Sequence, residues 1–113
     1  MELKPKYRII LSEEVDEFLE SLPEKAREKI LYNANLIALG ITDKELFKKL
    51  EGTDIWELRT LYAGISYRVL SFWDTRYNAL ILTTHGFIKK SDRTPRKEIE
   101  KAERIRAEYF KKL

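Results

Sequence analysis

The chain of 113 residues has no cysteine and only one histidine, His85. Without cysteine there is no disulfide, no thiolate metal site and no cysteine nucleophile. A single histidine also excludes a site built from several histidines, so we expect neither a metal nor another cofactor. No apolar run approaches the roughly 18 residues of a transmembrane helix, and residues 1–6 lack the apolar stretch of a signal peptide. We therefore expect a cytoplasmic protein that makes no membrane contact.

Glycine and proline are also scarce, at four and three residues, whereas hydrophobic residues make up 43% of the chain. This length and composition are typical of one globular domain, which we place over residues 1–113. The charge is uneven: residues 1–84 hold 12 Lys and Arg against 14 Asp and Glu, and residues 85–113 hold 10 against 5. A basic end on a nearly neutral body suggests an anionic partner, although lysine-rich terminal helices are often only solvated.

The first half of the chain predicts one strand and two helices. Residues 7–11 are rich in strand formers, and Ser12 then offers a helix N-cap. This first helix is expected to end near Ser21, where a capping box with Glu24 would begin the second. Gly40 is a natural residue to end it. The two apolar stripes indicate an αα-hairpin that packs on a sheet.

The second half predicts a β-meander followed by one helix. A short turn of helix is expected over 43–50, with Phe47 closing the core. Strand patterns cover 55–61, 65–73 and 79–87. Thr94 as N-cap and Pro95 at the first position would open the last helix. Its apolar stripe is Ile99, Ala102, Ile105, Tyr109 and Leu113. The predicted fold is α+β: a small, mostly antiparallel sheet made of the N-terminal strand and the three-stranded meander, with the αα-hairpin on one face and a C-terminal helix.

The register of the first hairpin decides which side chains share a face. A two-residue loop at 63–64 would set Tyr62 opposite Ile65 and Arg59 opposite Arg68. A three-residue loop would shift the register by one and send the arginines to opposite faces. We prefer the first register because it gives one clean apolar face. That face is Trp56, Leu58, Thr60, Tyr62, Ile65, Tyr67, Val69 and Trp73, and the other is Glu57, Arg59, Arg68, Leu70 and Phe72.

Opposed arginines destabilise a hairpin unless Glu57 compensates them diagonally or an anion binds between them. Arginine holds phosphate bidentately, and aromatic rings stack on unpaired bases. The sequence therefore predicts an RNA-binding face, with surface ion pairs as the alternative. Its candidate residues are Arg59, Arg68, Lys89 and Lys90 for charge stabilisation, with Glu57, Phe72, Phe87, Lys48 and Lys49 as further RNA contacts.

Proton transfer has several candidates by residue type. His85 is the obvious general acid or base, although a lone histidine in an apolar strand is more often structural. Glu57 could act as a base, but orienting an arginine is the preferred role. A crowded lysine can have a lowered pKa and serve instead. Lys48 and Lys49 can equally be plain exposed lysines.

Several motifs together resemble one known family. They are Leu50-Glu51-Gly52, Ile55-Trp56-Glu57-Leu58-Arg59, Gly64-Ile65-Ser66-Tyr67-Arg68-Val69-Leu70, His85-Gly86-Phe87-Ile88-Lys89-Lys90, Thr94-Pro95 and Glu98-Ile99-Glu100-Lys101-Ala102. In this combination and order, over nearly the whole chain, they resemble the phage-derived HigB-like branch of the RelE/ParE toxin superfamily.

The resemblance implies a type II toxin that enters the ribosome and cuts mRNA. Cleavage would use the 2′-hydroxyl as nucleophile, leave a cyclic phosphate and need no metal. The implied partners are the ribosome, mRNA and a helix-turn-helix antitoxin, with operator DNA bound only through that antitoxin. Arg59 and Arg68 match the family's sheet arginines, and Lys89 and Lys90 its lysine pair.

Two departures from the family leave the proton-transfer group open. Relatives often end in a catalytic tyrosine near the sheet, whereas Tyr109 is expected on the packing face of the last helix. Some relatives use paired histidines, and this chain has one. Two other functions also stay open on the same fold: a ParE-like protein that blocks gyrase by binding, and a non-catalytic remnant that acts as corepressor.

Overall fold

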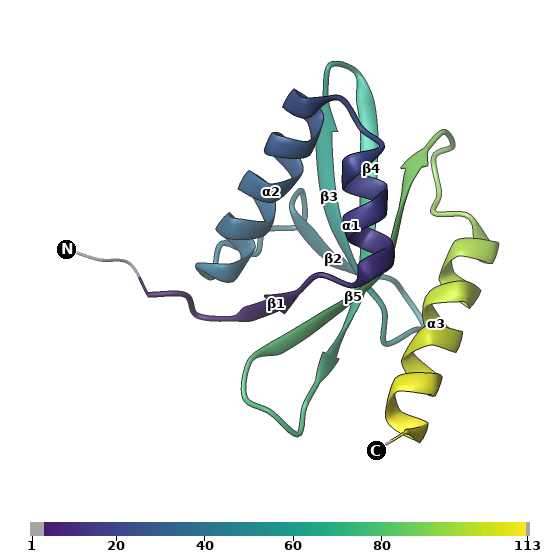
Figure 1. The fold of residues 1–113 in the computed structure, drawn as a ribbon. Helices are drawn as coiled ribbons and strands as arrows, with labels where there is room; N and C mark the ends of the chain where they lie inside the picture. The colour runs from purple at the N-terminus through teal and green to yellow at the C-terminus, as the bar shows by residue number, and fades with distance from the viewer. Residues whose placement is uncertain (1–3, 113) are drawn as a thin grey trace.

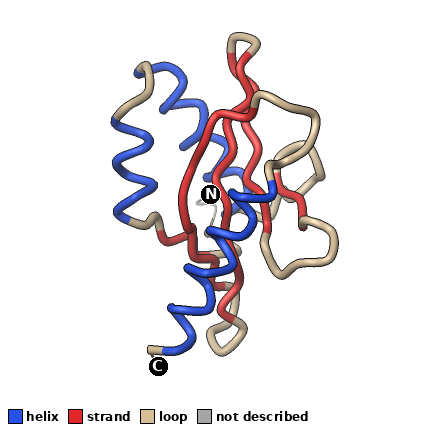
Figure 2. The backbone as a smooth tube through the Cα atoms, turned by 90° about the vertical axis from the view of Figure 1, so that its right-hand side faces the viewer, coloured by secondary structure: helices blue, strands red, loops and turns tan. Residues whose placement is uncertain are grey.

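The computed structural model describes residues 4–112, which form a five-stranded sheet with helices on both faces (Figures 1 and 2). In chain order the elements are β1 (Arg8–Ile10), α1 (Glu13–Glu20), α2 (Glu24–Ala38), β2 (Phe47–Lys49), β3 (Trp56–Tyr62), β4 (Ile65–Asp74), β5 (Leu80–Lys89) and α3 (Arg96–Lys111). The strand order is β1-β5-β4-β3-β2, and only the β1–β5 pair is parallel. The predicted α+β class, the hairpin and the meander are confirmed.

Ser12 is the N-cap of α1, as predicted, and it also fastens the helix to the sheet. Its Oγ accepts a hydrogen bond from the Val15 amide at 3.1 Å and donates to the Thr84 carbonyl at 3.0 Å. Its own amide donates to Thr83 Oγ1 at 2.9 Å. One side chain thus satisfies a helix terminus and joins it to β5, two elements more than 70 residues apart.

The predicted start of α2 is wrong, but its predicted end is confirmed. Pro23 occupies the N-cap position and makes no side-chain cap, because the Ser21 hydroxyl donates instead to the Phe18 carbonyl at 2.6 Å. At the other end Gly40 adopts a φ of +98°, which glycine reaches without steric cost. Its amide donates to Ile37 O and the next amide donates to Leu36 O, the bonding pattern of a Schellman motif.

The predicted helical turn over 43–50 is limited to a single turn, in which Asp43 Oδ1 caps the Glu45 amide and the Asp43 carbonyl accepts from the amides of Leu46 and Phe47. After a tight turn at Asp43, residues 47–49 become β2 and pair antiparallel with β3, with Phe47 opposite Leu58. The open edge of β3 offers this segment more hydrogen bonds than one isolated helical turn could make. Phe47 is 2% exposed and stacks on Trp56, so its predicted place in the core is confirmed.

The two-residue loop and its register are confirmed. Ala63 and Gly64 both have positive φ, at 51° and 78°, as a tight hairpin turn with the sheet's twist requires. Arg59 lies opposite Arg68. Further along, Thr84 and His85 together oppose a single residue of β4, which makes a β-bulge in β5.

Each face of the sheet has its own core. The predicted apolar face packs against α1 and α2, except that Ile65 is 40% exposed at the hairpin tip. The opposite face packs against α3, through Ile55, Leu70, Phe72, Phe87 and Ala102. In Figure 2 the helical hairpin lies to the left of the strands, whereas α3 crosses in front of them. No helix within residues 4–112 is long and apolar enough to cross a membrane.

Helix α3 confirms the predicted packing of Tyr109, but its predicted cap is wrong. Pro95 takes the N-cap position, and Thr94 makes no cap hydrogen bond because its hydroxyl is used by Glu57 on β3. Tyr109 donates a hydrogen bond to the fully buried Asp74 at 2.7 Å, which fastens the end of α3 to the β4 terminus. Leu113, expected on the same stripe, lies outside the described residues.

Candidate functional site

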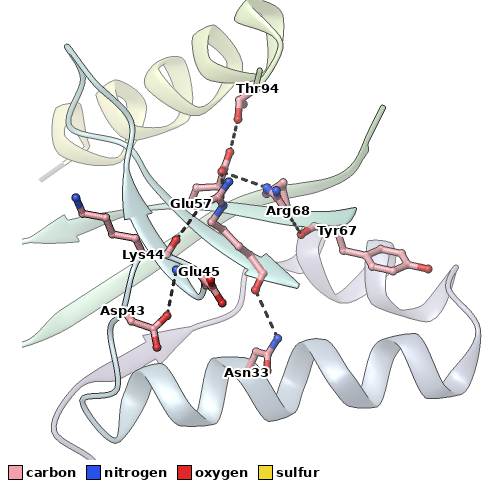
Figure 3. Close-up of polar contacts among 9 residues, drawn as sticks. Asn33, Asp43, Lys44, Glu45, Glu57, Tyr67, Arg68 and Thr94 are labelled. Atoms are coloured by element: carbon pink, nitrogen blue, oxygen red, sulfur yellow. Dashed lines mark hydrogen bonds and ion pairs between the residues drawn. The ribbon is translucent and has the colours of Figure 1, made fainter. Parts of the chain in front are cut away.

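Glu57 is the centre of a buried charge cluster on the α3 face of the sheet. Its side chain is 2% exposed, and Oε1 accepts a hydrogen bond from Arg68 Nε at 3.1 Å. Oε2 accepts from the Thr94 hydroxyl, so Figure 3 shows the carboxylate held between Arg68 and Thr94. Arg59 Nε lies 3.2 Å from Oε1, close enough for an ion pair, although this N–H makes no hydrogen bond. Glu57 therefore compensates the two opposed arginines.

The two arginines differ in how much they are exposed. Arg68 is 7% exposed, and its Nη1 donates to the Tyr67 carbonyl at 3.1 Å. Burial lowers the pKa of Arg68, an effect that the charge of Glu57 opposes. Arg59 keeps a quarter of its side chain exposed while its Nη1 donates to the Lys44 carbonyl at 2.9 Å. The Arg59 side chain is therefore accessible to a ligand, whereas Arg68 is buried beneath it and contributes only its positive charge.

Lys89 belongs to the same cluster. Phe87 lies opposite Arg68 on β5, and Lys89 follows two residues later on the same side of the strand. The pKa of Lys89 is lowered, first by burial and next by the neighbouring charge of Arg68. An amine with a lowered pKa gives up its proton more readily, which is the property that a lysine base requires.

A groove of about 530 Å³ opens over this cluster, between β2, β3 and the loop that leads to α3. We call it the basic groove. Its cations are Lys48, Arg59, Lys89 and Arg93, and its carboxylates are Glu51, Glu57 and Asp92. Both oxygens of Glu57 already accept hydrogen bonds, and its negative charge is balanced by the neighbouring arginines. The groove presents four cations to a ligand against the two remaining carboxylates.

The predicted lysines divide between this groove and other surfaces. Lys48 faces it because β2 places Lys48 opposite Glu57. Lys49 pairs with Trp56 and lines a different hollow, together with Asp54. Lys90 is exposed beyond the end of β5 and does not line the basic groove. The structure thus gathers Arg59, Lys89 and Lys48 and leaves Lys49 and Lys90 apart.

The expectation that Phe72 and Phe87 stack on RNA bases is wrong. Phe72 is 1% exposed and packs edge-on against Tyr109 and against Phe110. Phe87 is 9% exposed in the same core. The sequence placed Phe72 on the correct face of the sheet, but α3 covers the part of that face where both rings lie.

His85 lies beneath α3 and outside the basic groove. Its Nε2 is 3.2 Å from Glu98 Oε1 on α3, and its Nδ1 is 3.0 Å from the Thr84 hydroxyl. Burial lowers the pKa of this imidazole more than Glu98 raises it, which favours the neutral form. Two bonded ring nitrogens and 2% exposure fit the structural interpretation of this histidine.

Sequence reasoning missed two residues of the site, Arg93 and Thr94. Arg93 lines the groove from the loop before α3, where its charge was an available signal. Thr94 precedes a proline and so had the pattern of a helix cap. Nothing local to it reveals that its partner is Glu57, 37 residues earlier. Among residues 4–112 no group of three or more His, Asp or Glu side chains is placed to hold a metal ion.

The strand order and the helical hairpin define a RelE-like fold. Among solved structures, one that matches is E. coli toxin RelE in the free state, as a mutant with two arginines replaced by alanine. The TM-score is 0.63 at 14% sequence identity, over 88% of this chain and 96% of that one. The chain matches none of the curated proteins with which it was compared.

The model of the family described as "Phage derived protein Gp49-like (DUF891)" matches residues 17–107. The chain belongs to this family, a RelE/HigB-like toxin family, which confirms the resemblance found in its sequence. Membership in a RelE-type toxin family implies an antitoxin partner.

Proposed function

We propose that the protein is a ribosome-dependent mRNA endonuclease, the toxin of a type II toxin–antitoxin system. The observation that carries the proposal is the basic groove, where Arg59, Lys89 and Lys48 surround a space large enough for a nucleotide. Arg68 and Glu57 support it from beneath. The toxin family makes RNA the expected polyanion, and the protein would act in the cytoplasm.

The proposed reaction is a transesterification within the RNA strand. The 2′-oxygen attacks the adjacent phosphorus and forms the new P–O bond while the bond to the 5′-oxygen breaks. The products are a 2′,3′-cyclic phosphate and a free 5′-hydroxyl. The proton of the 2′-hydroxyl goes to a base, and the departing 5′-oxygen takes up a proton. The protein must therefore supply positioning, positive charge and proton transfer.

The groove offers a residue for each task. Arg59 and Lys48 would hold the phosphate oxygens, and the charge of Arg68 would stabilise the dianionic transition state. Lys89, with its lowered pKa, is the preferred base. Glu57 is poorly suited to that role because both of its oxygens already accept hydrogen bonds. Lys49 and Lys90 would contact phosphates further along the ribosome-bound mRNA.

The test is to induce the protein in cells and map mRNA ends by primer extension, with translation running and with translation blocked. We expect cuts inside translated codons that disappear when translation is blocked. Arg59→Ala should reduce cutting about 100-fold or more, the usual cost of losing a group that stabilises transition-state charge. Lys25→Ala, an exposed lysine on α2 away from the groove, is the matched control.

Two outcomes would contradict the proposal. Growth arrest with intact mRNA would point to a binding target such as gyrase, as in ParE-like proteins of this superfamily. No growth arrest at all would point to a corepressor that acts on operator DNA only through a helix-turn-helix antitoxin. In either case the basic groove would be a binding surface rather than an active site.

A further inference from the structure

A second groove, of about 440 Å³, lies between β1 and α2 and takes no part in the proposed chemistry. We call it the β1–α2 groove. Figure 1 shows these two elements beside each other, on the side of the molecule away from α3. The groove is mostly apolar, with Tyr7, Ile9, Leu11, Leu31, Ala34 and Ala38 in its lining.

Large apolar side chains remain exposed at and around this groove. Leu31, in the lining, is 40% exposed. Ile41, immediately after α2, is 46% exposed. A cluster of exposed apolar residues beside a hollow is typical of a protein-binding site. The described part of the chain has no segment that covers it.

The groove also borders an open edge of the sheet. β1 is the last strand on its side. The Arg8 amide donates to Ala79 O at 2.9 Å, and the Ile10 carbonyl accepts from Thr83 Oγ1 at 2.9 Å, so both residues turn their main chain toward β5. Main-chain groups alternate in direction along a strand, so those of Ile9 point to the open edge. An extended segment could pair there and lay alternate side chains in the groove.

The positive charge of the groove lining favours an acidic partner. Arg8 is in the lining, which contains no carboxylate. Arg27 lies one turn before Leu31 on α2, with Glu28 beside it, and Lys6 is next to Tyr7. None of these three cations makes an ion pair within residues 4–112. A second copy of the chain would bring the same cations to the groove and be repelled.

We propose that the β1–α2 groove binds an extended, acidic segment of the antitoxin, which pairs with the edge of β1 and buries apolar side chains against Leu31 and Ile9. The inference rests on membership in a toxin family and not on mRNA cleavage. The basic groove lies on the α3 face of the sheet and this groove on the other. A bound antitoxin segment therefore leaves the basic groove uncovered.

The test measures affinity for a helix-turn-helix antitoxin, which is first sought among the reading frames that flank the toxin gene. Leu31→Glu and Arg8→Glu should each raise the dissociation constant about tenfold or more, as loss of a central interface contact does. Ile65→Glu is the matched control, because Ile65 has the same 40% exposure but lies at the β3–β4 hairpin tip. Its affinity should stay within about twofold of wild type. Circular dichroism and urea unfolding establish that each variant is folded.

Hydrogen exchange of the complex gives a second measurement, with protection expected in residues 8–11 and 31–38. Unchanged affinity of folded Leu31→Glu, or protection only around the basic groove, would overturn the proposal. So would a free toxin that dimerises in a way that Leu31→Glu abolishes. Leu31→Glu should still cut mRNA. If the wild-type protein did not cut mRNA, the proposed function would be wrong, but the measured effect of Leu31→Glu on antitoxin binding would still stand.

Discussion

At the scale of single residues, Glu57 shows how a strand hairpin accommodates two opposed arginines. The carboxylate bonds Arg68 through one oxygen and the Thr94 hydroxyl through the other. A buried charge is stable only when hydrogen bonds replace its lost hydration. Thr94 is therefore part of what holds Arg59 and Arg68 in place, although it touches neither guanidinium.

Replacement of Thr94 tests this support. Thr94→Val keeps the shape of the side chain but leaves one oxygen of a buried carboxylate without its donor, at a cost of about 1.5–3 kcal/mol. We expect lower stability in urea and roughly tenfold slower mRNA cleavage, because the arginines lose their fixed anchor. Thr94→Ser, which restores the hydroxyl, should recover both. If the valine variant matched wild type in both assays, Thr94 would have no positioning role.

His85 makes stability depend on pH. The unfolded chain has an ordinary histidine pKa of about 6.5, and burial lowers the pKa in the folded protein. Between these two values the unfolded state binds the extra proton, so the free energy of unfolding falls as pH drops below about 6.5, by at most about 1.4 kcal/mol per pH unit.

His85→Gln removes this titration, so the stability lost between neutral and mildly acidic pH should shrink in the variant. Urea unfolding at several pH values measures the effect, and equal slopes in variant and wild type would contradict it. Activity should fall only modestly in this variant. A loss beyond about 1,000-fold would instead identify His85 as the general acid or base.

At the scale of elements, the contact between α1 and β5 depends on the absence of one side chain. A Cβ at Gly86 would lie 2.3 Å from Cδ2 and 2.6 Å from Cε2 of the Phe18 ring. Residue 86 must therefore be glycine, because the Phe18 ring from α1 occupies the space that a β-carbon would need. Phe18 itself packs against the first core.

Gly86→Ala should thus destabilise the protein by about 1–3 kcal/mol or more, because the helix or the ring must move. Chemical denaturation gives the value. Pairing it with Phe18→Leu supplies the control, since a smaller side chain leaves room for the new methyl group. The double variant should lose less than the sum of the single variants. Additive losses would show that the two positions do not compete for space.

At the scale of the whole molecule, positive charge is concentrated towards the C-terminal end of the chain and in the basic groove. Net charge is only +3, yet residues 85–113 carry an excess of five positive charges, and the basic groove joins part of this end to Lys48 and Arg59. Phosphate contacts release condensed counterions, so binding that depends on them weakens steeply with salt.

Ribosome binding by the toxin should therefore fall by orders of magnitude between about 50 and 200 mM salt. Lys48→Ala should weaken binding and reduce the slope of the logarithmic salt plot by about one, the share of one phosphate contact. Lys25→Ala should leave the slope unchanged. Co-sedimentation with ribosomes provides the measurement, and a flat response of the wild type would count against the cationic face.

The sequence by itself determined most of the elements, the hairpin register and the face that holds the arginines. These follow from local rules: Ser12 caps a helix, residues 63–64 form a two-residue turn, and the alternation of Trp56, Leu58 and Thr60 separates two faces. The family resemblance came from the same local motifs.

Only the tertiary structure decided which of those residues meet. It turned 47–49 into a strand because β3 had an open edge, and it buried Phe72 and Phe87 because α3 covers that face. In the folded protein the Thr94 hydroxyl also donates its hydrogen bond to Glu57 instead of capping a helix terminus. In each case the partner is distant in sequence, and local patterns specify a residue's conformation and face but not the neighbour that packing brings to it.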